Sequence, residues 1–186
     1  MKKNNSGFSL VELIVSVAIL GIIVAAVGAF AVSGSRAYAS VYSGVSLQVE
    51  SQMALNQVRE YAVDCGAGVY AGGSRLCLLD KETAAQPGGT ETVSYTEHIF
   101  ELSDGKLIYT RKTYSAAGQL TGSETGTVSE YVTEFAPVSA ADSVTVGMSL
   151  ERRGKNYTAS ETMAFRNTPM VFASESDLLY SIAPAA

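Results

Sequence analysis

The chain has few of the side chains from which active sites are built. Its 186 residues include no tryptophan, two cysteines and one histidine, His98. A single histidine excludes a metal site with two histidine ligands, and the chain has neither a phosphate-binding glycine loop nor a Gly-x-Ser-x-Gly elbow. We interpret His98 as a half-exposed strand residue. The sequence predicts no catalytic activity, no cofactor and no metal ion.

Positive charge and proline are also scarce. Lys and Arg number 13 against 18 Asp and Glu, so the formal net charge is -5. Because contacts to phosphate groups need clusters of Lys and Arg, this composition argues against nucleic acid as a primary partner. No proline precedes Pro87, so none interrupts a helix in the first part of the chain.

What the chain does have is a long apolar run near its start. Between Phe8 and Val32 the only charged residue is Glu12. A helix of about 25 residues spans roughly 37 Å, which exceeds the hydrocarbon thickness of about 30 Å. A carboxylate in such a helix costs about 2.5–3.5 kcal/mol at the bilayer centre and less near the interface. We therefore expect Glu12 to have a specific role.

The distribution of positive charge predicts the topology. Lys2 and Lys3 precede the apolar run, and the next basic residue is Arg36. The positive-inside rule then places the N-terminus in the cytoplasm and the chain beyond about residue 33 outside. The expected location is the cell membrane, which the chain crosses once.

A motif surrounds Glu12. Behind a short basic leader the chain reads Gly7-Phe8-Ser9-Leu10-Val11-Glu12-Leu13. This pattern resembles the N-terminus of type IV prepilins and pseudopilins, the subunits of type IV pili and of type II secretion and competence pseudopili. The resemblance implies that a prepilin peptidase cuts after Gly7 and that the new N-terminal Phe8 is methylated. It also implies that Glu12 pairs with the N-terminal amine of a neighbouring subunit.

The resemblance also implies partners and a fold. The partners are the prepilin peptidase, other pilin-like subunits, an inner-membrane assembly platform and membrane lipid, and the product is a cell-surface filament. An amine and a carboxylate are each costly alone in a low dielectric and attract strongly when paired, so the implied role of Glu12 is physically sound.

Two other interpretations of the N-terminus stay open. A secretory signal could be cut after Ala37-Tyr38-Ala39, but its apolar core is normally 7–15 residues long and carries no acid. A plain signal anchor explains the length of the run but leaves Gly7, Phe8 and Glu12 without a purpose.

After the apolar run, the pattern of an amphipathic helix begins. Its apolar positions recur at helical spacing, which predicts a stripe that faces a globular domain. We expect one helix over about 8–64, with bends near Gly28 and Gly34. The stripe consists of Val41, Val45, Val49, Met53, Leu55, Val58 and Ala62.

Beyond the helix the chain has the period of β-strands. The predicted strands are 92–102, 107–114, 127–138, 144–151 and 157–166, with tight turns at 103–106 and 153–156. Segments 66–74, 84–90 and 115–126 are predicted loops, and the tail 168–186 could add an edge strand. The expected fold class is α+β and type IV pilin-like, a long N-terminal helix packed on an antiparallel sheet.

The expected organisation has four parts. They are a leader (1–7), a transmembrane and assembly helix (8–32), the amphipathic half of the same helix (33–64), and an extracytoplasmic β-sheet domain with a C-terminal tail (65–186). Cys65 and Cys77 both fall in the last part. In an oxidising exterior they could form a disulfide, and the alternative is two buried free thiols.

Two features resemble minor subunits. The membrane segment lacks the proline that major pilins carry in its second half, and Phe165-Arg166-Asn167 resembles the end of the last core strand in J-like minor pseudopilins. The resulting hypothesis is a structural, non-enzymatic minor pilin or pseudopilin. The alternative is a membrane-anchored extracytoplasmic binding module that does not polymerise.

Overall fold

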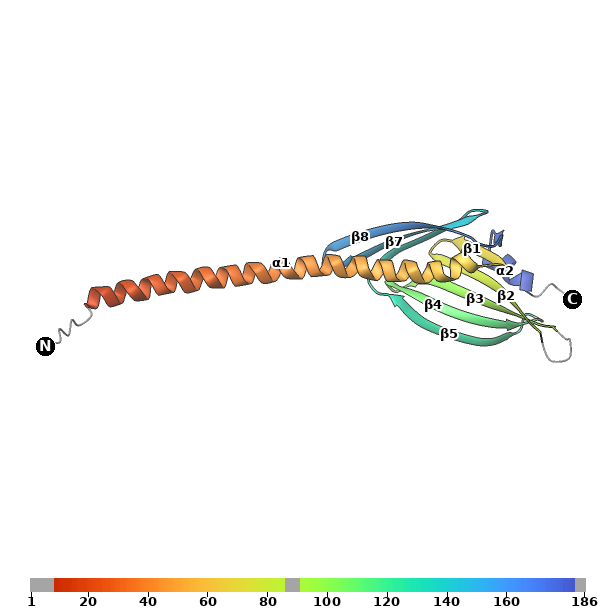
Figure 1. The fold of residues 1–186 in the computed structure, drawn as a ribbon, viewed down its shortest axis with the longest axis horizontal. Helices are drawn as coiled ribbons and strands as arrows, with labels where there is room; N and C mark the ends of the chain where they lie inside the picture. Colours follow the sequence, from red (N-terminus) through yellow and green to blue (C-terminus); the bar gives the residue numbers. More distant parts are fainter. Residues whose placement is uncertain (1–8, 86–90, 183–186) are drawn as a thin grey trace. The chain divides into compact units, whose positions relative to one another are not determined.

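The computed structural model describes residues 9–85 and 91–182 (Figure 1). The chain divides into two compact units, residues 1–42 and residues 43–186. In chain order the described elements are α1 (Leu10–Asp64), β1 (Gly68–Gly72), β2 (Arg75–Ala85), β3 (Glu91–Ser103), β4 (Lys106–Ser115), β5 (Leu120–Ser129), β6 (Val132–Ser139), β7 (Ser143–Arg152), β8 (Lys155–Ala164), β9 (Met170–Phe172) and α2 (Glu175–Ile182).

The described part of the first unit is α1 as far as Tyr42, preceded by Ser9. The carbonyl of Ser9 accepts the N–H of Glu12 at 3.0 Å and that of Leu13 at 3.1 Å, which closes the first helical turn. α1 continues as helix through Gly28 and Gly34, the positions where the sequence predicted bends.

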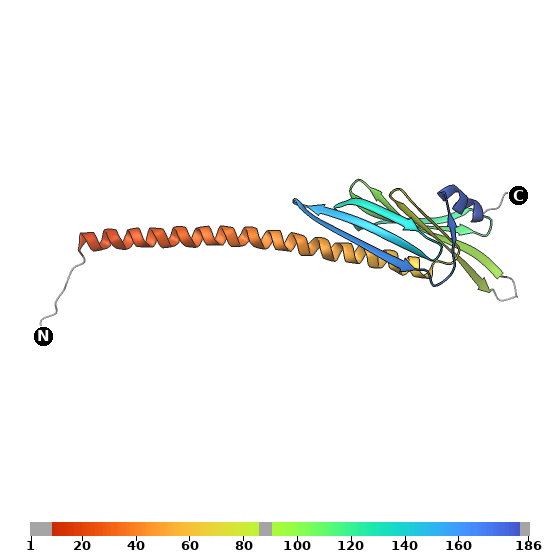
Figure 2. The ribbon, with the colours of Figure 1, turned by 90° about the horizontal axis from the view of Figure 1, so that it is seen from above.

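The second unit confirms the α+β architecture but divides the strands between two sheets. The larger has the order β5-β4-β3-β2-β1-β9, and the smaller has the order β6-β7-β8. Neighbouring strands are antiparallel except β1 and β9, which are parallel. Figure 2 shows, for this unit, the C-terminal part of α1 running along the strands.

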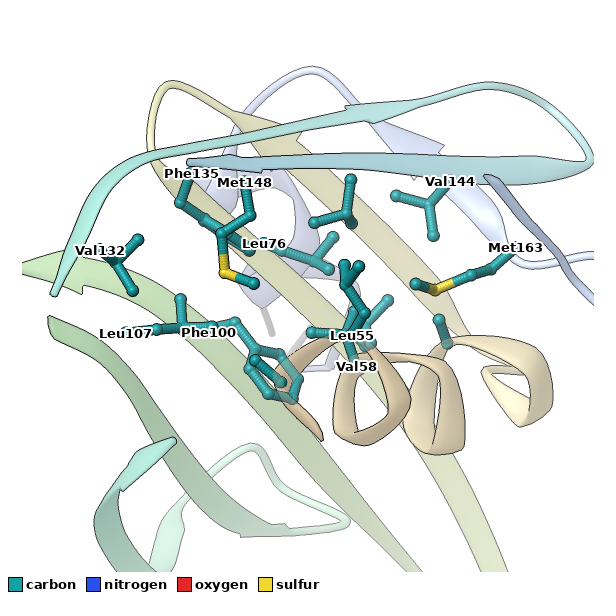
Figure 3. Packing of buried hydrophobic residues seen from close by; sticks show 14 of the residues in the cluster. Leu55, Val58, Leu76, Phe100, Leu107, Val132, Phe135, Val144, Met148 and Met163 are labelled. Carbon is teal, nitrogen blue, oxygen red and sulfur yellow. The ribbon is translucent and has the colours of Figure 1, made fainter. Parts of the chain in front are cut away.

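One core joins the helix to both sheets. The side chains of Leu55 and Val58 point from α1 into the space lined by Phe100 of the large sheet and Met148 of the small one (Figure 3). Both sheets and the helix therefore fold as one domain around a shared apolar core. The helix contributes Leu47, Ala54, Leu55, Val58 and Ala62 to it.

The predicted apolar stripe of the helix is wrong in its first half. Val45, Val49 and Met53 are 53%, 52% and 66% exposed, whereas Leu47 and Ser51 are buried. Small or branched residues at 47, 51, 54 and 58 lie on the face that meets the sheets. The chain thus has two apolar faces on one helix, and sequence spacing alone cannot tell which one the domain covers.

The strand predictions hold for the two hairpins with tight turns. Asp104 and Gly105 have φ of 50° and 72°, and Arg153 and Gly154 have φ of 52° and 71°. These left-handed pairs are typical of the two-residue turns that match the twist of antiparallel strands.

The predicted strand 127–138 is wrong because the chain changes sheets within it. β5 ends at Ser129 and β6 begins at Val132, with Tyr131 at φ 60° between them. Glu50 of α1 holds this crossing, since its Oε1 accepts the Ser129 hydroxyl at 3.1 Å and the Glu130 N–H at 2.5 Å. The predicted loop 115–126 is mostly the edge strand β5, which pairs along β4.

The tail adds both an edge strand and a helix. β9 extends the large sheet beside β1, as predicted, and β1 itself lies within the predicted loop 66–74. α2 begins behind Ser174, whose hydroxyl accepts the Asp177 N–H at 3.1 Å as an N-cap. Leu178 and Ile182, spaced by four, are buried against the large sheet.

The segment Phe165-Arg166-Asn167 closes the end of α1. The N–H of Arg166 donates to the carbonyl of Val63 at 2.8 Å, and Asn167 Nδ2 donates to the carbonyl of Asp64 at 2.9 Å. Arg166 also forms an ion pair with the Asp64 carboxylate. These contacts satisfy carbonyl groups that the last helical turn leaves unpaired.

Candidate assembly site

Glu12 lies in the first turn of α1 with its side chain exposed. A carboxylate at this position complements the partial positive charge of the helix N-terminus. The hydroxyl of Ser16 donates to the Glu12 backbone carbonyl at 2.7 Å, so Ser16 satisfies its own polar group inside the apolar segment. Gly7 and Phe8, the predicted cleavage and methylation residues, lie outside the described residues.

The helix around Glu12 is apolar on every side and exposed on every side. Each described residue from Ser9 to Tyr42 is exposed, with Leu10 at 75% and Phe30 at 80%. Among the described residues α1 is the one helix long and apolar enough to cross a membrane. A helix that is hydrophobic all round needs lipid or other apolar helices around it, because exposing its apolar side chains to water is unfavourable.

The part of α1 that belongs to the second unit has an exposed apolar surface of its own. Val45, Val49 and Met53 form an exposed row with a spacing of four residues, on the side of the helix not covered by the sheets. We call these three residues the valine–methionine row. An exposed row of this kind is what one helix presents to another.

Cys65 and Cys77 do not form the disulfide that the sequence left open; both are buried free thiols. Cys65 belongs to the core between α1 and the sheets, where its thiol donates to the carbonyl of Gly68 at 3.3 Å. Cys77 belongs to a second cluster, under α2. Leu76 and Leu78, its neighbours in β2, point into the first core, so Cys77 faces the opposite side of the sheet.

The surroundings of Cys77 contain a charged group that sequence reasoning missed. Glu97 of β3 is fully buried, and the hydroxyl of Tyr114 donates to its Oε2 at 2.9 Å. Glu175, at the start of α2, accepts from Arg75 at 2.8 Å. Burial raises the pKa of Glu97 above its usual range and that of Cys77 to about 12, although the positive charge of the nearby Arg75 opposes the second shift.

His98, in β3 of the large sheet, packs against α1. Contrary to the sequence interpretation it is buried, and its ring stacks on Tyr61 with centroids 4.1 Å apart. Its Nδ1 lies 2.8 Å from the hydroxyl of Tyr109, and its Nε2 lies 3.8 Å from Asp80. Burial lowers the pKa of His98 to about 4, so the ring is neutral at pH 7.

Comparison with known proteins identifies the N-terminal segment. Residues 2–28 match the family model described as the prokaryotic N-terminal methylation motif. No curated protein and no solved structure matches the chain. The family match includes Gly7, Phe8, Glu12 and most of the apolar run, and it confirms the resemblance to type IV prepilins and pseudopilins.

Proposed function

We propose that this chain, which carries the prepilin-type methylation motif of type IV pilins and pseudopilins, is a structural subunit of a pilin-like filament. The observation that carries the proposal is the combination of that motif with a helix that is apolar on all sides and bears one carboxylate in its first turn. Lipid covers this helix while the chain waits in the membrane, and the helices of neighbouring subunits cover it after assembly.

Processing is the first step of the proposed function. A prepilin peptidase cuts after Gly7 on the cytoplasmic side, and Phe8 becomes the methylated N-terminus. The cut removes Lys2 and Lys3 and creates an α-amine next to the apolar segment. The released amine is the positive charge that Glu12 of another subunit needs.

Glu12 is proposed to set the register between subunits. Each subunit brings one carboxylate and one amine, offset by four residues along the helix, so a staggered stack of helices neutralises every charge. Removing one member of a buried ion pair commonly costs about 3–5 kcal/mol, because the other member stays buried and unpaired. A wrong stagger therefore carries a penalty that apolar packing alone does not provide.

The valine–methionine row extends the proposed interface beyond the membrane. It supplies a further apolar contact where α1 is already folded against the sheets, since each of its three side chains is more than half exposed. The filament thus has two helical contacts for each subunit, one in the apolar segment and one along this row.

A minor, J-like subunit is the proposed subtype. Two features of the sequence support it: the apolar segment has no proline, and Phe165-Arg166-Asn167, directly after β8, resembles the end of the last core strand in J-like minor pseudopilins. Such a subunit is expected at the filament tip, with the C-terminal domain outside the membrane.

The experiment that tests the proposal replaces Glu12 by Val in the full chain. We expect Glu12→Val to insert in the membrane and to be cut after Gly7, but to lose crosslinking and co-purification with other pilin-like subunits. Glu60→Val is the matched control, since Glu60 is an exposed acid of the same helix outside the apolar segment. Assembly of Glu12→Val at the level of the wild type contradicts the register role of Glu12. If blocking the Phe8 amine nevertheless causes a strong defect, that result indicates the tip position, where no subunit above offers an amine to Glu12.

A non-polymerising anchored module would behave differently in the same experiment. Neither Glu12→Val nor the wild type would recover pilin-like subunits, and the membrane-extracted chain would retain Met1 to Gly7. Mass spectrometry of the mature N-terminus in cells that contain a prepilin peptidase therefore separates the two functions.

A further inference from the structure

Three potential metal ligands meet beneath α2. The thiol of Cys77 in β2 and one carboxylate oxygen each of Glu97 in β3 and Glu175 in α2 all lie within 4.8 Å of one another. They come from two consecutive strands and from a helix that is far from both in the sequence. Ligand atoms around one tetrahedral ion are roughly 3.5 Å apart, so small side-chain rotations bring these three to binding distance.

Glu97 supplies an independent sign that a partner belongs there. Its side chain has no exposed surface, and its Oε2 is held by Tyr114. Its other oxygen, Oε1, is buried and has no hydrogen-bond partner among the described residues. A buried carboxylate oxygen without a partner is costly, and each such group in a native structure calls for an explanation.

The charges around the cluster also indicate that a cation belongs there. Three carboxylates, those of Glu97, Glu101 and Glu175, face two cations, Arg75 and Lys112. One negative charge therefore has no counterpart in the described surroundings. A proton on Glu97 would remove that charge, but an Oε1–H group would itself lack an acceptor there.

We propose that Cys77, Glu97 and Glu175 bind a divalent metal ion of the zinc class, with water as a fourth ligand. A thiolate beside two carboxylates suits Zn²⁺, which accepts sulfur and oxygen ligands in a tetrahedral site. Ca²⁺ and Mg²⁺ prefer oxygen ligands alone and so do not fit a site that includes Cys77.

The neighbouring side chains fit this role as an outer shell. Tyr114 orients the Glu97 carboxylate through Oε2 and leaves Oε1 for the ion. Arg75 holds Glu175 through Oε1 and has a buried Nε without a hydrogen-bond partner among the described residues, which a Cys77 thiolate would satisfy. The ion would tie the start of α2 to the large sheet.

The test is a titration of the reduced, full-length chain in detergent with Zn²⁺ and, separately, with Co²⁺. We expect one Zn²⁺ for each chain, a rise in Tm with Zn²⁺, and a thiolate-to-cobalt charge-transfer band. Cys77→Ser should abolish the band and weaken Zn²⁺ binding at least about 100-fold, more than the loss of an outer-shell partner does. Cys65→Ser, at the other buried thiol, should leave both unchanged.

Several results would overturn the site. They are no Zn²⁺ on the wild type, a cobalt spectrum without the thiolate band, or equal losses with Cys65→Ser and Cys77→Ser. If Cys77→Ser does not fold by circular dichroism, Glu175→Gln serves instead, because the Glu175 side chain is 30% exposed and tolerates replacement. Zn²⁺ affinity of Glu175→Gln equal to that of the wild type would also exclude the site.

Discussion

Cys65 and Cys77 lie on opposite faces of the large sheet although few residues separate them. The intervening chain passes along β1 and turns back into β2, where side chains alternate between the two faces. Leu76 and Leu78 take the face toward α1, so Cys77 takes the face under α2. A change of one position in this alternation would have placed the two thiols in the same core.

This placement predicts the chemistry of the two thiols. In the folded chain neither should react rapidly with an alkylating reagent, because both are 0% exposed and burial raises the pKa of each to about 12. After denaturation without reductant both should be alkylated, as mass spectrometry can show. A chain that is two hydrogens lighter and accepts no label would contradict the structure.

His98 gives a pH-dependent prediction. Its folded pKa of about 4 lies below the unfolded value of about 6.5, so the unfolded state binds more protons between these values. The contribution of His98 to the free energy of unfolding is therefore complete above pH 6.5 and falls as pH decreases toward 4, by at most about 3 kcal/mol.

The measurement for His98 uses its uniqueness. The chain has one histidine, so a single ring signal in an NMR titration of the folded chain reports its pKa directly. A midpoint near 6.5 would contradict the buried, neutral ring. His98→Gln is the control for stability, since it should remove this part of the acid dependence while Asp80 and Glu97 still titrate.

At the scale of elements, the periodicity of apolar residues predicts where a helix or strand lies but not which face of α1 is buried. Helical spacing predicted the helix to Asp64 correctly, and strict alternation predicted β7, where Val144, Val146, Met148 and Leu150 are buried. The helix, however, has apolar residues on two faces, and the face that the domain covers depends on sheets that form only in three dimensions. The chain passes between the two sheets at Tyr131, which has a positive φ, and beside the contact of Glu50 with Glu130.

The candidate sites differ in the same respect. The methylation motif is contiguous, so it could be recognised from order and spacing, whereas Glu97 and Glu175 meet Cys77 only through strand pairing and the docking of α2. Glu97 in the middle of a predicted strand was the one available signal, because a charged residue at a buried strand position needs a partner.

A valine-to-alanine substitution should have different effects on the two faces of α1. Val58 is fully buried, so Val58→Ala should lower the free energy of unfolding by about 2 kcal/mol. Val49 is 52% exposed, so Val49→Ala should change it by less than about 0.5 kcal/mol. Urea unfolding of the full chain in detergent, followed by circular dichroism, compares them. Only Val49→Ala is expected to reduce co-purification with pilin-like subunits while the fold stays intact.

At the scale of the whole molecule, the two units need different surroundings. The second unit has its own apolar core and would be stable in water, whereas the helix of the first unit exposes apolar side chains all round and needs lipid or other helices. The formal charge of -5 becomes -7 when the leader is removed with Lys2 and Lys3. The proposed cleavage would therefore remove the positive charges that predict the orientation, and it would supply the amine that the proposed assembly requires.

Processing is accordingly the prediction that concerns the whole chain. In cells with a prepilin peptidase the mature protein should begin with methylated Phe8, and Gly7→Val should keep its leader because a branched side chain crowds the peptidase site. Glu12→Val should be cut normally, since it leaves Gly7 and the leader intact, so the two variants separate cleavage from assembly. Intact-mass measurement of the three membrane-extracted proteins decides between the outcomes. A wild-type chain that retains Met1 to Gly7, or a Gly7→Val chain that loses them, would mean that the motif is not the processing site and that the amine facing Glu12 is never released.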